Sequence, residues 1–83
     1  MKTVYILQSI SHPFQQYAGI TENVLARLKA HNAGQSPHTS KFRPWKVIVA
    51  IQFEDDSKAH SFEKYLKTGS GKAFAKRRFL NRK

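Results

Sequence analysis

Three short stretches of the chain have the apolar pattern of β-strands. Residues 3–10 consist largely of β-branched, aromatic and aliphatic side chains up to a turn at Pro13, which fixes φ and lacks a backbone donor. Residues 15–20 form a second extended piece within reach of a hairpin turn, and residues 45–53 alternate as a buried strand does. We expect the first two pieces to pair antiparallel, with residues 45–53 as a third strand.

A first helix is predicted over residues 21–34. Thr21 is the expected N-cap, Glu22 suits the first turn, and Gly34 suits the end of the helix. The apolar stripe of this segment consists of Val24, Leu25 and Leu28. Residues 34–44 then form a polar loop, which either contacts a phosphate group or is an ordinary solvated loop.

A second helix is predicted between Asp55, as a cap, and Gly69, as its end. Its apolar positions are Ala59, Phe62 and Leu66. Gly69-Ser70-Gly71 is expected to be a flexible joint that leads into a short basic helix over residues 72–80, anchored by Phe74 and Leu80. The predicted fold is thus α/β: residues 1–83 form one small domain, with a three-stranded, largely antiparallel sheet flanked by helices in the order ββαβα plus a terminal helix.

The net charge of the chain indicates which kind of partner it binds. The chain has 15 Lys and Arg against 5 Asp and Glu, a net charge of +10. The last acidic residue is Glu63, and the basic residues that follow it are Lys64, Lys67, Lys72, Lys76, Arg77, Arg78, Arg82 and Lys83. Such an excess favours nucleic acid as the ligand. Ribosomal proteins and general RNA-binding modules are equally basic, so charge does not separate binding from catalysis.

The absence of cysteine excludes several kinds of site. With no cysteine there is no disulfide, no thiolate nucleophile and no Cys-based zinc site, which is typical of a cytoplasmic protein. The apolar run of residues 1–7 is too short for a signal peptide or a membrane span, so we expect neither export nor membrane contact. His12 and His60 have no partner at metal-ligand spacing, and Trp45 is expected in the core.

Four polar side chains are candidates for chemistry. Tyr5 and Tyr17 lie on the two strands of the predicted hairpin, which can bring their phenols together, although strand tyrosines are more often packing residues. Arg27 and His31 stand four positions apart, so a helix places them on one face, roughly 5–6 Å from each other. By themselves such residues are more often part of an ordinary soluble helix surface.

Two motifs resemble those of a known family. Thr3-Val4-Tyr5 and Tyr17-Ala18-Gly19 are similar to the two strand motifs of the GIY-YIG nucleases, and Arg27 follows Tyr17 by ten residues as in that family. His31 and Glu63 fall where the family has its other functional side chains. The resemblance covers nearly the whole chain, extends to small standalone bacterial members, and includes the excision-repair nuclease amino-terminal domain, which implies a role in DNA repair.

The sequence departs from the family pattern at several positions. Thr3 replaces the first Gly, Ala18 replaces an Ile, and Ile20 stands where the excision-repair members have a Lys. No Asn follows Glu63 at the spacing at which several members use one to hold phosphate or substrate, because Asn81 is too far along the chain.

The resemblance implies a role for each candidate. Glu63 would hold one Mg²⁺ or Mn²⁺ ion, whose other ligands are water and phosphate oxygen. Arg27 would stabilise phosphoryl charge, while Tyr5 and Tyr17 orient or deprotonate the attacking water with help from His31. A phenol is a poor base at its free pKa of about 10, so it needs these neighbours. Glu63 lies at the edge of the apolar face of its helix, which would shield it partly from water.

Three functions remain open from the sequence. The first is a metal-dependent endonuclease that hydrolyses DNA. The second is a nucleic-acid-binding module with the same fold and little turnover, and the third is an RNA-binding protein unrelated to nucleases. A carboxylate among phosphate-binding cations would repel the ligand, which favours the enzyme. Cleavage of RNA, a protein partner that supplies specificity, and the oligomeric state are left open.

Overall fold

The structure is a computed structural model that describes residues 1–80. Its elements, in chain order, are β1 (Lys2–Ser9), β2 (Gln16–Thr21), α1 (Val24–Asn32), α2 (Pro37–Ser40), β3 (Trp45–Phe53), α3 (Asp56–Leu66), α4 (Gly69–Ala75) and the π-helical turn η1 (Lys76–Leu80). The predicted ββαβα order with a terminal helix is confirmed. Asn81, Arg82 and Lys83 lie outside the described residues, so the carboxyl end of the basic arm stays a prediction.

β1 is the central strand of the sheet. It pairs antiparallel with β2 on one side and with β3 on the other, which gives the strand order β2-β1-β3. Tyr5 lies opposite Gly19, and Leu7 lies opposite Tyr17. The antiparallel hairpin was predicted from two extended pieces joined by a short turn, and the third strand from the alternation of apolar residues; both are confirmed.

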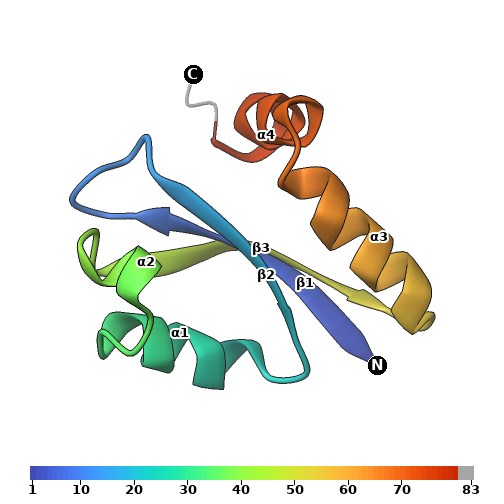
Figure 1. Ribbon diagram of the computed structural model, residues 1–83, viewed down its shortest axis with the longest axis horizontal. Helices are drawn as coiled ribbons and strands as arrows, with labels where there is room; N and C mark the ends of the chain where they lie inside the picture. The colour runs from blue at the N-terminus through green and yellow to red at the C-terminus, as the bar shows by residue number, and fades with distance from the viewer. Residues whose placement is uncertain (81–83) are drawn as a thin grey trace.

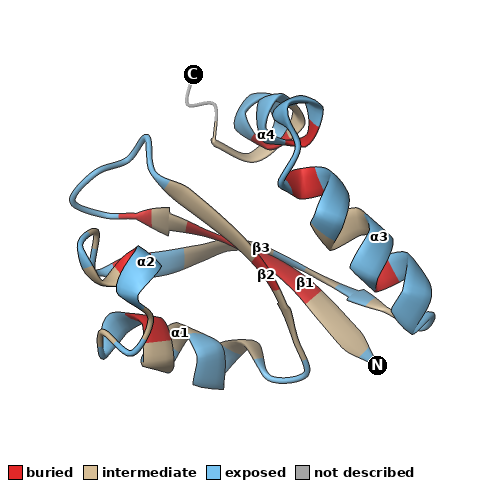
Figure 2. Cartoon of the chain, viewed as in Figure 1, coloured by how far each residue is buried: buried red, intermediate tan, exposed pale blue. Residues whose placement is uncertain are grey.

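Helices cover the two faces of the sheet (Figure 1). α1 and α2 lie on one side, and α3 and α4 lie on the other. Because side chains alternate along β1, its buried residues divide between two apolar clusters: Val4 and Ile6 pack with α3 and α4, whereas Tyr5 and Leu7 pack with Trp45 and α1. β1 accordingly carries most of the buried positions of the sheet (Figure 2).

α1 begins later than the sequence predicts. Its N-cap is Asn23, whose side chain accepts a hydrogen bond from the Ala26 N–H at 3.0 Å. Thr21 instead accepts from the Asn23 N–H at 3.1 Å, so it supports the turn before the helix. With this start, Leu25 faces solvent at 75% exposure and does not belong to the apolar stripe. Val24 and Leu28 do pack against the cluster around Tyr5.

The segment after α3 also differs from the prediction. Asp55 caps α3 as expected, but the helix ends at Leu66, before Gly69. Residues 69–71 are no flexible joint, because they form the first turn of α4, where the Thr68 side chain accepts from the Gly71 N–H. A Cβ at Gly71 would collide with the Tyr65 carbonyl oxygen, so α4 packs against the end of α3 only with glycine here.

The loop over residues 34–44 contains the short helix α2, which the sequence did not predict. Trp45 is in the core at 4% exposure, as expected. His12 and His60 are exposed, also as expected. Within residues 1–80, no helix combines the length and the apolar character needed to cross a bilayer.

Candidate active site

Tyr5 forms the floor of the candidate site. It is 1% exposed in the middle of β1, and its ring passes against Gly19 of the neighbouring strand. A Cβ at Gly19 would lie 2.5 Å from the Tyr5 hydroxyl oxygen, closer than side-chain atoms pack. Glycine is therefore required at position 19, where the Tyr5 phenol approaches the backbone of β2.

His31 lies beside that phenol and is equally buried. Its Nε2 is 3.3 Å from the Tyr5 hydroxyl, and its Nδ1 is 2.9 Å from Thr39 Oγ1 of α2. We assign the Thr39 hydroxyl as a donor to the Ser36 carbonyl, 3.5 Å away, so that its oxygen accepts from His31 Nδ1–H. His31 Nε2 is then the acceptor for the Tyr5 O–H. The expectation that His31 and Arg27 share one face of the helix is confirmed, since both interact with the Tyr5 hydroxyl. The alternative of an ordinary soluble surface is wrong for His31, whose imidazole is buried between the hydroxyls of Tyr5 and Thr39.

Tyr17 completes an aromatic group over His31. Its ring centroid is 4.7 Å from that of His31 and 6.4 Å from that of Tyr5. Tyr17 is partly exposed whereas Tyr5 and His31 are buried, so Tyr17 is the phenol at the surface of the site. The two predicted phenols are thus brought together at one place on β1 and β2.

Arg27 lies at the rim of this group. Its side chain is exposed, yet it interacts with the Tyr5 hydroxyl. Burial raises the pKa of the Tyr5 phenol above its ordinary value, and Arg27 offsets this rise only in part. Burial, followed by the charge of Arg27, lowers the pKa of His31 below its ordinary value. At neutral pH the pair is therefore a protonated phenol and a neutral imidazole.

Glu63 approaches from the other helical layer. Its side chain is 15% exposed, which confirms the expected partial shielding. Lys67, one helical turn later, places its Nζ 2.7 Å from Glu63 Oε2 and 5.7 Å from the centroid of the Tyr17 ring. This ion pair raises the pKa of Lys67. Lys67 thus connects Glu63 to the phenols through a contact of the cation–π kind.

Glu63 is the carboxylate of this site that could bind a divalent ion. Within residues 1–80, no group of three or more His, Asp or Glu side chains could enclose a metal. Mg²⁺ commonly binds proteins through one or two carboxylates and takes its other ligands from water and substrate phosphate. A shielded Glu63 fits that mode of binding, and Lys67 occupies one of its oxygens in the absence of an ion.

Sequence reasoning missed two residues of the site. Lys67 was assigned only to the basic run, although its i,i+4 spacing from Glu63 was a usable signal. Thr39 was placed in a polar loop that either contacts phosphate or is solvated, but it is 2% exposed and binds His31 instead. Its backbone carbonyl accepts from Trp45 Nε1 at 2.8 Å, which fixes α2 against the core. No pattern in the sequence pairs Thr39 with His31.

Protonation of His31 should make folding depend on pH. Its pKa in the folded chain lies below the unfolded value of about 6.5, so the unfolded chain takes up the proton first as pH falls. The groups facing the imidazole are Tyr5, Tyr17, Arg27 and Thr39. None is acidic. We expect the free energy of unfolding, measured with urea between pH 7.5 and 5, to decrease below about pH 6.5 by up to roughly 1.4 kcal/mol per pH unit.

His31→Gln should flatten this slope, and His60→Gln on the exposed surface of α3 should keep it. Equal slopes in the parent and His31→Gln would show that another group carries the pH dependence.

The comparison with known proteins addresses the family directly. Residues 1–78 match the family described as the GIY-YIG catalytic domain. The chain belongs to the GIY-YIG family. The matched range includes every residue of the site described above, Lys67 and Thr39 among them. Membership in this family makes the chain a catalytic domain of the endonuclease type, which hydrolyses phosphodiester bonds.

A relative with a described activity is the structure-specific endonuclease subunit SLX1 of Debaryomyces hansenii. It is 39% identical to this GIY-YIG chain in an alignment that covers 61% of this chain and 19% of the relative. The chain therefore spans about a fifth of that protein's length. The family resemblance seen in two short motifs is confirmed, while a closer likeness to the excision-repair members remains a prediction.

Proposed function

We propose that this GIY-YIG domain is a metal-dependent endonuclease that hydrolyses DNA, with Tyr5, Tyr17, Arg27 and His31 as catalytic residues and Glu63 as the metal-binding residue. The observation that carries the proposal is the buried Tyr5–His31 hydrogen bond, with Arg27 at its rim. A buried phenol bonded to a neutral imidazole has no evident use in a surface that only binds nucleic acid. It is well suited to moving a proton.

The raised pKa of Tyr5 determines how it would act. A protonated phenol does not remove a proton from water by itself at neutral pH. In our proposal the water gives its proton to the Tyr5 oxygen while the Tyr5 hydroxyl proton moves to His31 Nε2. His31 then carries the positive charge, and Thr39 continues to accept from its Nδ1–H. The lowered pKa keeps His31 unprotonated, and therefore ready to accept, before the reaction.

Arg27 and Tyr17 would act on the phosphate. The exposed guanidinium offers two parallel donors to phosphoryl oxygens, on which negative charge increases during attack. Tyr17, at the surface above His31, would orient the water or the phosphate with its hydroxyl. A divalent ion held by Glu63 would add positive charge beside the scissile phosphate. Lys67 would then release one Glu63 oxygen and remain close to Tyr17.

The Glu63–Lys67 ion pair also supports the second candidate, a nucleic-acid-binding module with little turnover. A bare carboxylate would repel phosphate, and this was the argument against a pure binder. Lys67 neutralises that carboxylate at 2.7 Å, so binding without an ion is electrostatically feasible. The buried proton-transfer pair still favours the enzyme.

The substrate and partners are proposed from the relative. The SLX1 protein is named as a structure-specific endonuclease subunit, so we propose branched or otherwise structured DNA as substrate and a protein partner that supplies specificity. Placement in the cytoplasm, a role in DNA repair and Mg²⁺ or Mn²⁺ as the ion belong to the same proposal.

A nicking assay tests this function. Purified protein is incubated with supercoiled plasmid and with branched and linear DNA in Mg²⁺, Mn²⁺ or EDTA, and with RNA of matched sequence. We expect cleavage of DNA in one or both metals and none in EDTA. Tight binding to all these nucleic acids without cleavage in either metal would instead support the binding module.

A further inference from the structure

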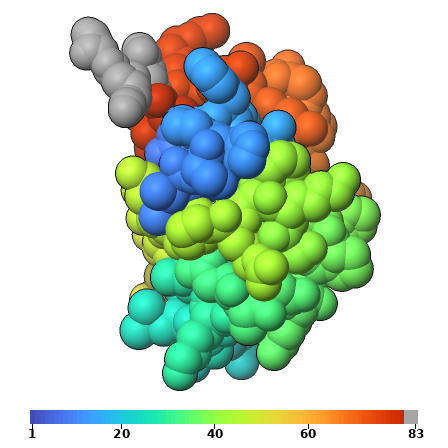
Figure 3. All heavy atoms as spheres, turned by 90° about the vertical axis from the view of Figure 1, so that its left-hand side faces the viewer, coloured from blue at the N-terminus to red at the C-terminus, as the bar shows by residue number. Residues whose placement is uncertain are grey.

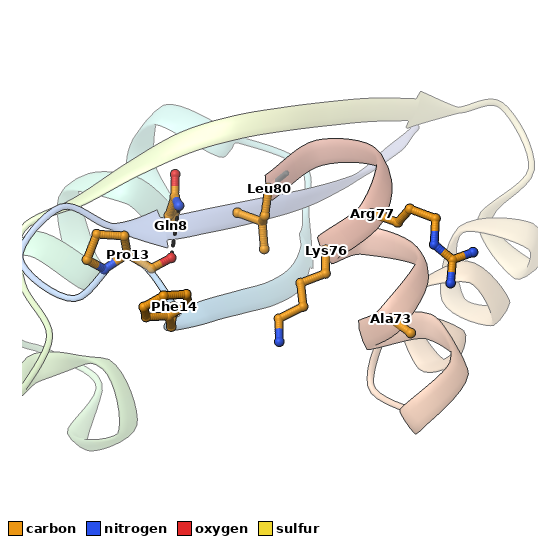
Figure 4. Close-up of a pocket in the computed structure, with 7 residues that line it drawn as sticks. All are labelled: Gln8, Pro13, Phe14, Ala73, Lys76, Arg77 and Leu80. Carbon is orange, nitrogen blue, oxygen red and sulfur yellow. Dashed lines mark hydrogen bonds between the residues drawn. The ribbon is translucent and has the colours of Figure 1, made fainter. Parts of the chain in front are cut away.

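A hollow lies away from the Tyr5–His31 pair. It has a volume of about 580 Å³ and separates the tip of the β1–β2 hairpin from α4 and η1 (Figure 4). Its lining residues are Gln8, Pro13, Phe14, Ala73, Lys76, Arg77 and Leu80. In Figure 4 the Lys76 side chain extends between Phe14 and Ala73.

Two further hollows follow one another from this hollow to the active site beside the edge strand β2. A neighbouring hollow of about 450 Å³ shares Phe14, Ala73 and Lys76 with it and adds Lys72 and Gln16. A third, of about 230 Å³, shares Lys72 and Gln16 and ends at Tyr17 and Lys67. We refer to these three hollows together as the β2 groove. One end holds Phe14 and the other holds the surface phenol of the active site.

The charge of the β2 groove is all of one sign. Its basic residues are Lys67, Lys72, Lys76 and Arg77, and no Asp or Glu lines any of the three hollows among residues 1–80. Lys67 is paired with Glu63, so Lys72, Lys76 and Arg77 supply the net positive charge of the groove. A row of cations without a carboxylate is complementary to a phosphate backbone. Because the groove ends at Tyr17, a strand lying in it would lead to the site of hydrolysis.

Phe14 indicates which form of nucleic acid the groove receives. Its side chain is 87% exposed at the hairpin tip, beside Lys76. The hairpin region projects at the surface between η1 and the rest of the molecule (Figure 3). An exposed aromatic ring next to cations is the usual platform for stacking an unpaired base. Inside a duplex the base faces are already stacked on one another, so away from duplex ends it is an unpaired strand that offers its base to Phe14.

We propose that the β2 groove binds an unpaired nucleic-acid strand next to the scissile phosphate, with Phe14 stacking on a base and Lys72 and Lys76 contacting phosphates. This inference rests on the proposed function, because the proposed catalytic role of Tyr17 makes that end of the groove the site of cleavage. It adds to that function a preference for substrates in which duplex meets single strand. A peptide in the groove is the competing occupant, but the row of cations without acidic residues favours the nucleic acid.

The test is binding measured in EDTA, which removes cleavage from the readout. Fluorescence anisotropy compares a blunt duplex with the same duplex carrying a single-stranded tail. Phe14→Ala should weaken binding of the tailed DNA roughly tenfold and leave blunt duplex unchanged. Phe14→Trp should restore the affinity, and its emission should be quenched by tailed DNA only. The existing Trp45 is buried, so the parent provides the background signal.

The lysines are tested by the salt dependence of binding. A double variant that combines Lys72→Ala and Lys76→Ala should have a shallower salt dependence. The slope of log K for binding of the tailed DNA against log salt should fall by about 0.7 for each phosphate of the tail that the variant no longer neutralises. Lys58→Ala, at the exposed amino-terminal end of α3 and outside the groove, is the charge control and should leave the preference for tailed DNA unchanged.

Two results would overturn the inference. Either Phe14→Ala weakens the binding of blunt and tailed DNA equally, or it weakens the binding of neither. These outcomes differ from failure of the proposed function. If binding of the tail depends on Phe14 but no metal supports cleavage, the proposal for the groove is supported and the proposed endonuclease activity is wrong. If the parent cuts DNA while Phe14→Ala keeps full affinity for the tail, the proposed endonuclease activity is supported and the proposal for the groove is wrong.

Discussion

Glu63→Gln should abolish DNA cleavage while DNA binding stays the same or becomes tighter. The amide keeps the shape of the side chain but loses the charge that holds a hard divalent ion. The loss of several kcal/mol of charge stabilisation corresponds to a decrease of roughly a thousandfold or more in the single-turnover rate. Affinity should improve if it changes, because a negative charge near phosphate is removed and Lys67 is freed from its ion pair.

Glu22→Gln is the matched control for this variant. Glu22 is exposed and pairs at 3.5 Å with Lys2, away from the aromatic group. It loses the same charge and should cleave as fast as the parent. Binding of Mn²⁺ in the absence of DNA gives a second readout, which should weaken in Glu63→Gln and stay unchanged in Glu22→Gln. Equal Mn²⁺ affinity in all three proteins would remove Glu63 as the ligand.

Arg27→Ala should reduce both affinity and turnover. The guanidinium would meet the phosphate in the ground state and more strongly in the transition state, so we expect a loss of several-fold in DNA affinity and of roughly 10²- to 10³-fold in the single-turnover rate. Without Arg27 the pKa of Tyr5 should also rise further, because the cation that lowers it is gone. Proton transfer through Tyr5 would then be slower as well.

Two further variants separate charge from geometry. Arg27→Lys keeps the positive charge but loses the planar pair of donors, so it should recover most of the affinity and little of the rate. Lys29→Ala removes an exposed charge from the same helix and should change the salt dependence slightly without affecting the rate at saturating DNA. If Arg27→Ala cleaves like Lys29→Ala, the guanidinium contributes only general electrostatic attraction.

Much of the fold follows from local patterns in the sequence. Residues 4–7 form a continuous apolar run because β1 is covered on both faces, and the apolar alternation of residues 45–53 marks β3. The predictions that were wrong concern positions where more than one residue could form the same structural feature. Thr21 and Asn23 are both good caps, and tertiary contacts of α1 select Asn23. Gly71 was taken for a flexible residue because close packing of α4 on α3 is not visible in the sequence.

The site was predictable where residue type and spacing coincide. Tyr5, Tyr17 and Arg27 were identified from motifs, and the structure brings them together with His31. The inward turn of His31 depends on Thr39, eight positions later in a separate helix, and spacing alone does not predict such a contact. The position of Lys67 over the Tyr17 ring likewise depends on how α3 crosses the edge strand β2.

The proposed mechanism requires that one site, with Glu63 holding the ion, hydrolyses DNA. Its sharpest test is the single-turnover nicking rate of the parent and of Glu63→Gln, purified in parallel and measured at saturating protein in Mg²⁺ and in Mn²⁺. The mechanism predicts EDTA-sensitive nicking by the parent and a rate for Glu63→Gln that is at least about a thousandfold lower, with both proteins bound to the DNA. Nicking by Glu63→Gln at the parent's rate in both metals would contradict it.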